Sequence, residues 1–263
     1  ELVGSDIAGF IKERHVGAVR SMSIKPCLAI VSTSDDEVSA VYMKIKQRYA
    51  EDIGALTEVI STTEAEFDNV INDLNQRTDI HGIIIQLPLK DTTKTDHVLG
   101  LVSTAKDVDG LGKNPIFDPA TPTAILWLLA AYNIDLRGKK VLIIGQGSLV
   151  GAPLAHMLIN SEVDVTTADD TSKDLQAMCL ASDIVVSAAG VPNLISADMI
   201  SEGTVLIDAG TSTDNGIVVG DVADDVRSRD DIMITPIKGG VGPLTVAALF
   251  ENLLQAARNQ TNG

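Results

Sequence analysis

An apolar run that ends in glycines, near the middle of the chain, constrains the fold more than any other feature. Residues 141–144 read Val-Leu-Ile-Ile, residues 145–151 form the turn Gly-Gln-Gly-Ser-Leu-Val-Gly, and an apolar helical pattern follows. This order indicates a buried strand, then a tight turn, then the start of a helix. At such a turn, backbone N–H groups and the positive end of the helix dipole can bind a pyrophosphate. The pattern predicts a nucleotide-binding domain. Because about half of the chain precedes it, it also predicts a separate part that handles the substrate.

Length and composition exclude several classes of protein. The chain has 263 residues and is 45% hydrophobic, which is enough for two domains with substantial cores. No apolar run approaches the ~20 residues that span a bilayer, and the first residues do not read as a signal peptide. The two cysteines, Cys27 and Cys179, have neither a disulfide framework nor metal-ligand spacing. We therefore expect a cytoplasmic protein without a metal site.

The net charge of −16 argues against two kinds of partner. Nucleic acids and anionic membranes both attract a basic surface, which this composition does not provide. We expect neither as a partner. An anionic small molecule would need a local cluster of basic residues, because the field of the whole chain repels it.

Strand patterns alternate with helix patterns on both sides of the glycine turn, which is typical of parallel α/β sheets. The expected strands cover residues 27–31, 55–60, 82–87, 140–145, 163–168, 183–187, 204–208 and 232–235. The expected helices cover residues 5–20, 36–53, 67–74, 150–160, 173–180, 196–201 and 243–258. Thr63 and Glu66 form a candidate capping box, Thr121-Pro122 predicts a helix start, and Asn215-Gly216 predicts a hairpin turn.

These patterns predict an α/β protein of two domains. Residues 1–120 form a substrate domain, and a C-terminal helix within residues 243–263 packs back on it. Residues 121–242 form a Rossmann-type parallel-sheet domain for NAD(P), which includes the helix that links the two.

Ser39, Tyr42 and Lys46 form the first candidate site, because positions three and four apart share one face of a helix. A lysine beside an aromatic residue on a partly apolar stripe is a candidate for a lowered pKa, since desolvation disfavours the ammonium form. Such a lysine exchanges protons near neutral pH. A lysine that only snorkels from a core helix would give the same pattern.

Two further polar groups follow strand patterns in the first half. Gln86 ends the run 83–85 just before Leu87-Pro88, at the end of a strand, where ligands of open α/β sheets collect. Asp109 belongs to the segment 107–110, Asp-Val-Asp-Gly, and a carboxylate there can accept two hydrogen bonds from an amidine-like edge. An ordinary strand-end glutamine and an Asx turn are the alternatives that need no ligand.

The nucleotide site draws on loops that follow several strands of the second half. Asp169 and Asp170 come roughly 20 residues after the glycine turn, where an acid holds a ribose hydroxyl and disfavours the additional phosphate of NADP. Acids at a helix N-terminus are the alternative. Residues 239–243 open a helix and can contact the nicotinamide or ribose through their backbone. The candidate contacts are Gly145, Gln146, Gly147, Ser148, Val150, Gly151, Asp169, Asp170, Ala189, Gly190, Asp208, Gly210 and Gly240.

The order of these pieces is specific as a set. The sequence contains Tyr42-x-x-x-Lys46, Gln86-Leu-Pro-Leu89, Lys106-Asp-Val-Asp-Gly110, Thr121-Pro122, Val150-Gly-x-Pro153 and Gly239-Gly-Val-Gly-Pro243. Over essentially its whole length the chain resembles the bifunctional methylenetetrahydrofolate dehydrogenase/methenyltetrahydrofolate cyclohydrolase family.

The resemblance implies two activities in one-carbon metabolism, which supplies purine and amino-acid biosynthesis. They are oxidation of 5,10-methylenetetrahydrofolate with NAD or NADP and hydrolysis of the methenyl product to 10-formyltetrahydrofolate. The resemblance also implies a cytoplasmic homodimer. In each subunit the first domain and the last helix would hold the folate, the second domain would hold the dinucleotide, and the folate would lie in the cleft between the domains.

The resemblance carries roles onto individual residues. Lys46 matches the family's catalytic lysine, Gln86 its assisting glutamine, Tyr42 the aromatic residue that stacks on the folate, and Asp109 the aspartate that binds the pterin edge. The implied substrate contacts are Ser39, Tyr42, Lys46, Gln86, Leu87, Pro88, Asp109, Gly240 and Pro243.

The glycine turn departs from the family pattern. The family's turn commonly reads Gly-Arg-Ser, whereas Gln146 and Gly147 follow the first glycine here. Loss of that arginine, together with Asp169 and Asp170, favours NAD over NADP. The alternatives are a dehydrogenase without cyclohydrolase activity, a folate- or nucleotide-binding protein with weakened catalysis, and a shikimate-type dehydrogenase, which would not explain the motifs at residues 86–89 and 107–110.

Overall fold

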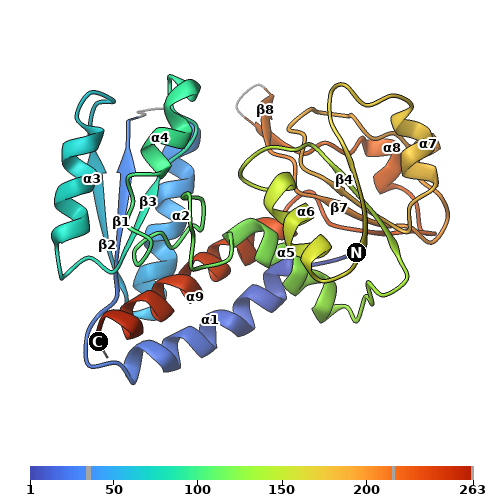
Figure 1. The fold of residues 1–263 in the computed structure, drawn as a ribbon. Helices are drawn as coiled ribbons and strands as arrows, with labels where there is room; N and C mark the ends of the chain where they lie inside the picture. Colours follow the sequence, from blue (N-terminus) through green and yellow to red (C-terminus); the bar gives the residue numbers. More distant parts are fainter. Residues whose placement is uncertain (34–36, 215–216, 262–263) are drawn as a thin grey trace. The chain divides into compact units, whose positions relative to one another are not determined.

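The computed structural model describes residues 1–33, 37–214 and 217–261, and the chain divides into two compact units (Figure 1). Unit 1 comprises Glu1–Ala8 and Thr121–Thr245, and unit 2 comprises Gly9–Ala120 and Val246–Gly263. The division differs from the predicted one at the start of the chain. Residues 1–8 belong to unit 1 because the backbone N–H of Leu2 donates to the carbonyl of Ile234 and that of Gly4 to the carbonyl of Gly239.

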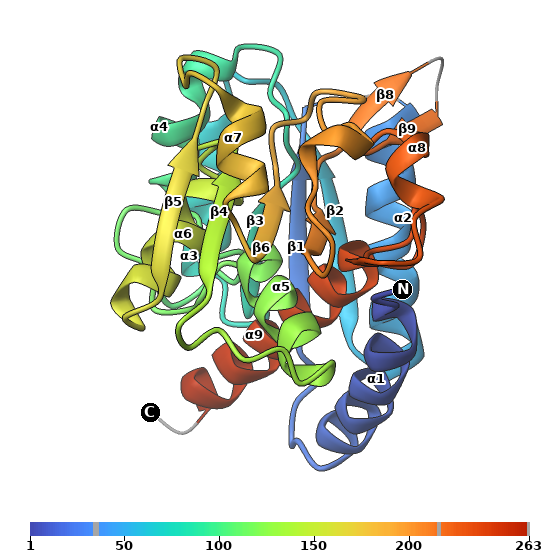
Figure 2. The same cartoon turned by 90° about the vertical axis from the view of Figure 1, so that its right-hand side faces the viewer.

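Unit 1 contains a five-stranded parallel sheet in the order β10-β7-β6-β4-β5, of which β5, β4 and β6 are labelled in Figure 2. The chain leaves β4 for β5 on one side and returns to β6 on the other side of β4. A sheet of this kind binds dinucleotides where the strand order reverses, here between β4 and β6. The strands are β4 (Lys140–Ile144), β5 (Asp164–Ala168), β6 (Ile184–Ser187), β7 (Val205–Asp208) and β10 (Met233–Ile234).

Short helices and an antiparallel strand pair complete unit 1. Its core brings side chains of β4, β6 and β7 together with those of the helices that follow β5, β6 and β7. The further elements are α5 (Ala120–Ala131), α6 (Gly151–Asn160), α7 (Leu175–Leu180), η2 (Ala197–Met199), β8 (Ser212–Asp214), β9 (Ile217–Val219) and α8 (Asp224–Arg227). The predicted hairpin turn at Asn215-Gly216 lies outside the described residues, although β8 and β9 pair antiparallel.

Two expectations for unit 1 were wrong in detail. The helix expected at residues 196–201 is only the short 3₁₀ turn η2. The turn ends at Ile200, whose backbone is extended (φ −114°, ψ 126°), and the guanidinium of Arg229 donates to the carbonyls of Ala197 and Ile200. The helix expected to start at Thr121-Pro122 begins one residue earlier, at Ala120.

Unit 2 contains a three-stranded parallel sheet in the order β2-β1-β3. All residues of β1 and β3 are buried, because the parallel sheet is covered on both faces. On one face, side chains of β1 and β3 pack against Phe67 and Ile71 of α3 and Val98 of α4. The elements are β1 (Cys27–Ser32), α2 (Glu37–Ile53), β2 (Leu56–Ser61), α3 (Phe67–Gln76), β3 (Gly82–Ile85), η1 (Thr92–Lys94) and α4 (Thr95–Leu99).

The predicted capping box before α3 forms only in part. The carboxylate of Glu66 accepts from the backbone N–H of Thr63 at 3.3 Å and from its hydroxyl at 2.9 Å. The Thr63 hydroxyl therefore binds the glutamate, and α3 begins at Phe67 without a side-chain cap from its N-cap residue.

Two long helices complete the chain: α1 (Gly4–Arg20) and α9 (Val241–Thr261). They meet α2 at His15, which is 1% exposed. His15 Nδ1 lies 3.0 Å from the Tyr49 hydroxyl, and Nε2 lies 2.9 Å from the Glu251 carboxylate. The hydrogen bond to His15 is the main reason why the pKa of Glu251 falls to about 2. Tyr49 also stacks on Phe250 of α9, so the part of this helix from Val246 onward packs within unit 2.

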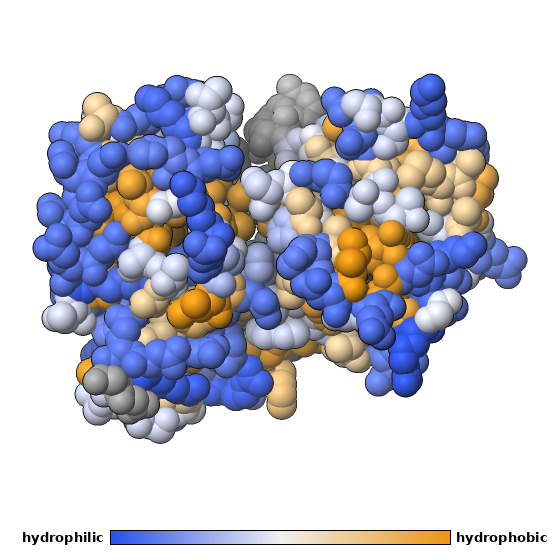
Figure 3. Space-filling model, in the orientation of Figure 1, coloured by the Kyte–Doolittle hydropathy of each residue, from blue (hydrophilic) through white to orange (hydrophobic). Residues whose placement is uncertain are grey.

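The surface offers no extended apolar face in the view of Figure 3, where hydrophilic residues predominate and hydrophobic ones form separate patches. Exposed large hydrophobic residues occur in both units, among them Phe10, Val41, Ile45, Ile159 and Ile237. Scattered residues of this kind are normal on proteins. Within the described parts of the chain, no helix combines the length and apolarity that a membrane crossing requires.

Candidate functional site

The lysine and the glutamine predicted to act together lie together in unit 2. Lys46 is on α2, which follows β1, and Gln86 follows β3, the strand next to β1. Lys46 Nζ donates to Gln86 Oε1 at 3.0 Å. Gln86 Nε2 donates to the carbonyl of Leu87 at 3.0 Å, and Gln86 N donates to the carbonyl of Val31 at 2.8 Å. These two bonds fix the glutamine at the carboxyl edge of the sheet with its side-chain oxygen toward the amine.

Burial and one carboxylate determine the charge of Lys46. Burial lowers the pKa of this half-buried lysine because the ammonium loses hydration, and the charge of Asp109 acts in the opposite direction. Burial raises the pKa of Asp109, and the charge of Lys46 opposes that rise. Desolvation thus disfavours the charged form of both groups, an arrangement typical of sites that exchange protons.

Asp107 shapes the loop that carries Asp109. Its carboxylate accepts three backbone N–H groups, those of Gly110 at 3.1 Å, Leu111 at 3.3 Å and Gly112 at 2.8 Å. Gly110 has a φ of +69°, and a Cβ there would lie 2.6 Å from the carbonyl oxygen of Phe117. The Asx-type turn anticipated for this segment therefore belongs to Asp107, whereas Asp109 interacts electrostatically with Lys46.

The remaining candidates of unit 2 surround the same strand ends. Tyr42 lies one turn before Lys46 on α2, and burial raises the pKa of its hydroxyl, which keeps the phenol neutral. Ser39, one turn earlier, is buried. Leu87 and Pro88 follow Gln86 directly, and the peptide bond between them is cis.

In unit 1, close backbone contacts require the first and last glycines of the turn. Gly145 has a φ of +90°, and a Cβ there would lie 2.5 Å from the carbonyl oxygen of Ala188. A Cβ at Gly151 would overlap the carbonyl oxygen of Gly145. By contrast, the same position at Gly147 has no atom within 4 Å. The two outer glycines are therefore needed for packing, and the middle one leaves open space at the turn.

Helix α6 begins at this turn without a capping side chain. Its N-cap residue, Val150, makes no side-chain hydrogen bond, and N–H groups of an uncapped helix start attract anions. Gly145 N donates to the carbonyl of Ala168 and Ala188 N to that of Ile144, both at 2.8 Å. These bonds continue the sheet past the strand ends. The loops after β4, β5 and β6 therefore meet at one edge, and this brings the predicted turn, Asp169 and Ala189 together.

The acidic candidates differ in what their carboxylates already bind. Asp169 and Asp170 are exposed at the end of β5. The Asp169 carboxylate accepts from the hydroxyl and backbone N–H of Thr171, which lower its pKa, and from the Ser172 hydroxyl. Asp208 has a side chain only 4% exposed. Its carboxylate accepts from the backbone N–H groups of Gly210, Asp221 and Val222 and from Arg227. With its carboxylate engaged in this way, Asp208 can offer a ligand its backbone rather than its side chain.

The last candidates lie at the start of α9. Gly240 precedes this helix, Pro243 is in its first turn, and both belong to unit 1.

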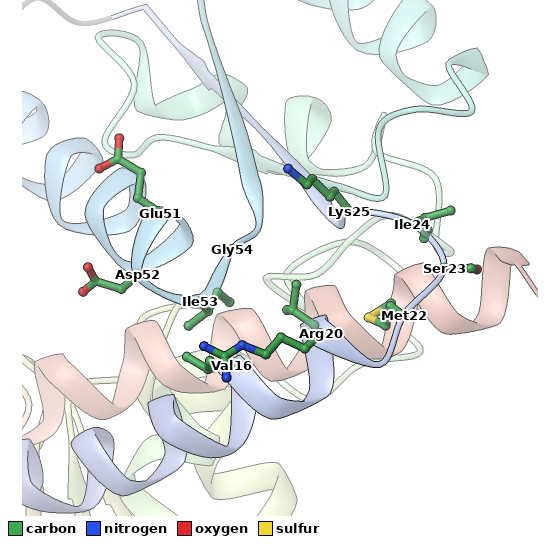
Figure 4. A pocket seen from close by; sticks show the side chains of 11 residues that line it. Val16, Arg20, Met22, Ser23, Ile24, Lys25, Glu51, Asp52, Ile53 and Gly54 are labelled. Atoms are coloured by element: carbon green, nitrogen blue, oxygen red, sulfur yellow. The ribbon is translucent and has the colours of Figure 1, made fainter.

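A hollow of about 530 Å³ in unit 2 contains none of these candidates (Figure 4). Lys25, just before β1, and Gly54, just before β2, line it, so it lies at the amino ends of the strands. Ligands of parallel α/β sheets bind at the carboxyl ends, where Gln86 is found. Across the described ranges, no group of three or more His, Cys, Asp or Glu side chains could hold a metal ion.

Two family models divide the chain in sequence order. The tetrahydrofolate dehydrogenase/cyclohydrolase catalytic domain matches residues 2–109, and the NAD(P)-binding domain of the same family matches residues 119–261. The chain belongs to the tetrahydrofolate dehydrogenase/cyclohydrolase family. It is 39% identical to the "Bifunctional protein FolD" of Campylobacter jejuni (strain RM1221), over 93% of this chain and 92% of that protein.

Solved structures of this family have the same fold. The bifunctional FolD of Campylobacter jejuni superposes with a TM-score of 0.90 at 35% identity, covering 98% of each chain. The FolD of Trypanosoma brucei, solved with NADP cofactor and an inhibitor, superposes with a TM-score of 0.91 at 29% identity, covering 99% of this chain and 98% of that one. The α/β fold, the resemblance and an NAD(P)-binding domain are therefore confirmed, and the chain is an enzyme of the tetrahydrofolate dehydrogenase/cyclohydrolase family.

Proposed function

We propose that this protein oxidises 5,10-methylenetetrahydrofolate with NAD(P) and hydrolyses the methenyl product to 10-formyltetrahydrofolate. The observation that carries the proposal is the 3.0 Å hydrogen bond between Lys46 Nζ and Gln86 Oε1, at a lysine whose pKa burial lowers. Hydride transfer alone needs no amine that exchanges protons, whereas hydrolysis needs a base for water. The site therefore favours both activities over dehydrogenation alone.

In the proposed hydrolysis, the neutral Lys46 amine takes a proton from the water that attacks the methenyl carbon. A C–O bond forms, and the lysine returns the proton to the departing nitrogen as a C–N bond of the ring breaks. The second proton of the water leaves to solvent as the formyl C=O forms, and this release removes the positive charge of the methenyl substrate. Gln86 Oε1 accepts from the amine in both of its charge states and so holds it in place. Tyr42 stacks on the folate and excludes water from one of its faces. Asp109 binds the pterin edge. The glycine turn at Gly145–Gly151 would hold the NAD(P), which would supply the hydride acceptor of the oxidation step.

The other proposed substrate contacts are Ser39, Leu87, Pro88, Gly240 and Pro243. Ser39 shares a helix face with Tyr42 and Lys46. Leu87 and Pro88 are adjacent to the fixed glutamine. Gly240 and Pro243 match the family motif at the start of the last helix.

The proposed dinucleotide is NAD rather than NADP. Gln146 stands where the family commonly has an arginine, and Asp169 and Asp170 are exposed after β5. Two negative charges at this edge repel a 2′-phosphate. We expect kcat/KM to be about tenfold higher with NAD, which corresponds to about 1.4 kcal/mol from the lost arginine and the two repelling carboxylates together. A higher kcat/KM with NADP would contradict this preference.

The proposed assembly and location are a homodimer in the cytoplasm, and both rest on family membership alone. Sedimentation equilibrium tests the assembly. A mass near one chain at micromolar concentration would contradict the dimer.

Two spectrophotometric assays test the main proposal. One follows reduction of NAD and NADP by methylenetetrahydrofolate, and the other follows hydrolysis of methenyltetrahydrofolate without dinucleotide. We expect both reactions. Reduction without hydrolysis would indicate the dehydrogenase-only alternative, and the absence of both would indicate a binding protein.

A further inference from the structure

A fully buried carboxylate, Asp221, holds the loop that follows β6. The residue is 0% exposed and does not belong to any motif of the sequence analysis. Its Oδ2 accepts from the Ser187 hydroxyl at 2.6 Å and from Ala189 N at 2.8 Å, and its Oδ1 accepts from Val191 N at 2.8 Å. Three neutral donors thus satisfy both oxygens, and two of them are backbone groups on either side of Gly190.

The same carboxylate lies against the loop after β7. A Cβ at Gly210 would overlap the Asp221 carboxyl group, so only glycine lets this loop come so close. Asp221 N donates to Asp208 Oδ1 at 3.0 Å, and Arg227 pairs with Asp208 at 2.6 Å. The side chains of Asp208 and Asp221 therefore join the loops that follow two neighbouring strands of the sheet.

The anchored loop packs directly against the glycine turn. A Cβ at Gly145 would lie 2.5 Å from the carbonyl oxygen of Ala188 and 2.8 Å from Cα of Ala189. Ala189 is only half-buried and Gly190 is exposed. Both residues are thus accessible at the reversal between β4 and β6, while the carboxylate that holds the loop is fully buried.

We propose that Asp221 is a positioning residue for the dinucleotide, because its carboxylate holds residues 188–191 in the conformation that receives this ligand. The inference rests on the proposed function, which supplies the dinucleotide. A loop that is already ordered loses less conformational entropy when a ligand binds, so its affinity is higher. Removing the anchor weakens dinucleotide binding and leaves the Lys46 site of unit 2 intact.

Three substitutions test this role. Asp221→Asn keeps the shape of the side chain but turns an NH₂ group toward a backbone N–H. Ser187→Ala removes one of the three bonds and leaves the two backbone bonds. Asp183→Asn is the matched control, since Asp183 Oδ2 accepts from Lys140 N at 2.8 Å at the amino ends of the same sheet.

The measurements separate the two halves of the enzyme. Calorimetry gives the Kd for NAD and for NADP, steady-state assays give KM for the dinucleotide and for methylenetetrahydrofolate, and hydrolysis of methenyltetrahydrofolate needs no dinucleotide. We expect Asp221→Asn to raise the Kd and KM of the dinucleotide at least about tenfold, because the hydrogen bonds that hold the loop are disrupted. Ser187→Ala removes only one of these bonds, and we expect it to raise both values about threefold. The folate KM and the hydrolysis rate stay within about twofold, and Asp183→Asn leaves all values within about twofold.

An unchanged dinucleotide Kd in folded Asp221→Asn, or an equal rise in Asp183→Asn, would overturn the proposal. So would a matching fall in hydrolysis, because a general loss of structure lowers both activities. If Asp221→Asn does not fold, an unchanged Kd in Ser187→Ala contradicts the proposal by itself. If the unaltered protein binds NAD but catalyses neither reaction, the proposed function fails, and the Kd comparison still tests the positioning role.

Discussion

Replacing Lys46 by alanine is expected to abolish hydrolysis of methenyltetrahydrofolate in a protein that still folds. A positioned general base contributes about 10²–10⁴-fold to a rate, which corresponds to about 2.7–5.4 kcal/mol of activation free energy. Among the hydrogen bonds of the described residues, only Lys46 Nζ donates to Gln86 Oε1, so the substitution leaves this oxygen without a donor.

The loss of stability is expected to be smaller. Gln86 is 7% exposed, and leaving its oxygen without a donor costs about 1–3 kcal/mol. Removing a lysine that burial desolvates offsets part of this cost. A domain is stable by about 5–15 kcal/mol, so the variant remains folded and its lost activity reports on chemistry.

Two further variants identify the function of the amine. Lys46→Arg keeps a positive charge and several donors, but a guanidinium does not become neutral, so hydrolysis is expected to fall as far as in Lys46→Ala. Lys44→Ala, on an exposed side chain of the same helix, is the control and is expected to retain activity. Initial hydrolysis rates are compared at equal concentration and pH, with circular dichroism to confirm folding. Hydrolysis by Lys46→Arg within about tenfold of the unaltered rate would refute proton exchange by this amine.

Three further predictions concern the pairing of Asp109 with Lys46, the glycine turn of unit 1 and the carboxylate of Glu251. The hydrolysis rate rises with pH as Lys46 loses its proton, and Asp109→Asn moves that rise to lower pH because it removes the charge that raises the pKa of Lys46; an unmoved pH–rate profile would contradict the pairing. Gly151→Ala lowers stability by about 2–3 kcal/mol or more, because a Cβ at this position would overlap the carbonyl oxygen of Gly145. Gly147→Ala changes stability by less than about 1 kcal/mol, because the same position at Gly147 is open. Equal urea unfolding midpoints for the two variants would contradict this. The folded-state pKa of Glu251, about 2, lies below the ordinary 4.5, so the stability that its carboxylate contributes is present above pH 4.5 and is lost as pH falls toward 2. We therefore expect the unfolding free energy of Glu251→Gln to fall less than that of the unaltered protein between pH 6 and pH 3. Equal falls in the two proteins would show that this carboxylate is not responsible.

Much of the fold followed from local pattern. The apolar runs of β1 and β4 are bounded by polar or glycine residues, so their existence and type could be predicted from sequence. The helix expected at residues 196–201 is only one turn long: the backbone is extended at Ile200, and a distant arginine, Arg229, donates to the carbonyls of Ala197 and Ile200. A contact between residues so far apart in sequence leaves no periodic signal.

The site was predictable to the extent that its residues share a short motif. Helical spacing placed Tyr42 beside Lys46, and strand-end position singled out Gln86. Spacing does not distinguish the two aspartates of the 107–110 segment, and only the structure assigns the turn to Asp107. Asp221 could not be predicted because the groups that donate to its carboxylate lie 30 to 34 residues away and no motif surrounds it.

The central claim is that the Lys46 amine loses its proton more readily than an ordinary lysine. The most direct measurement follows the ¹³Cε and ¹⁵Nζ resonances of labelled protein through a pH titration, with the Lys46 signal assigned by its absence in Lys46→Arg. We expect a midpoint below the ordinary lysine value, and a still lower midpoint in Asp109→Asn. A midpoint equal to or above the ordinary lysine value would contradict this claim.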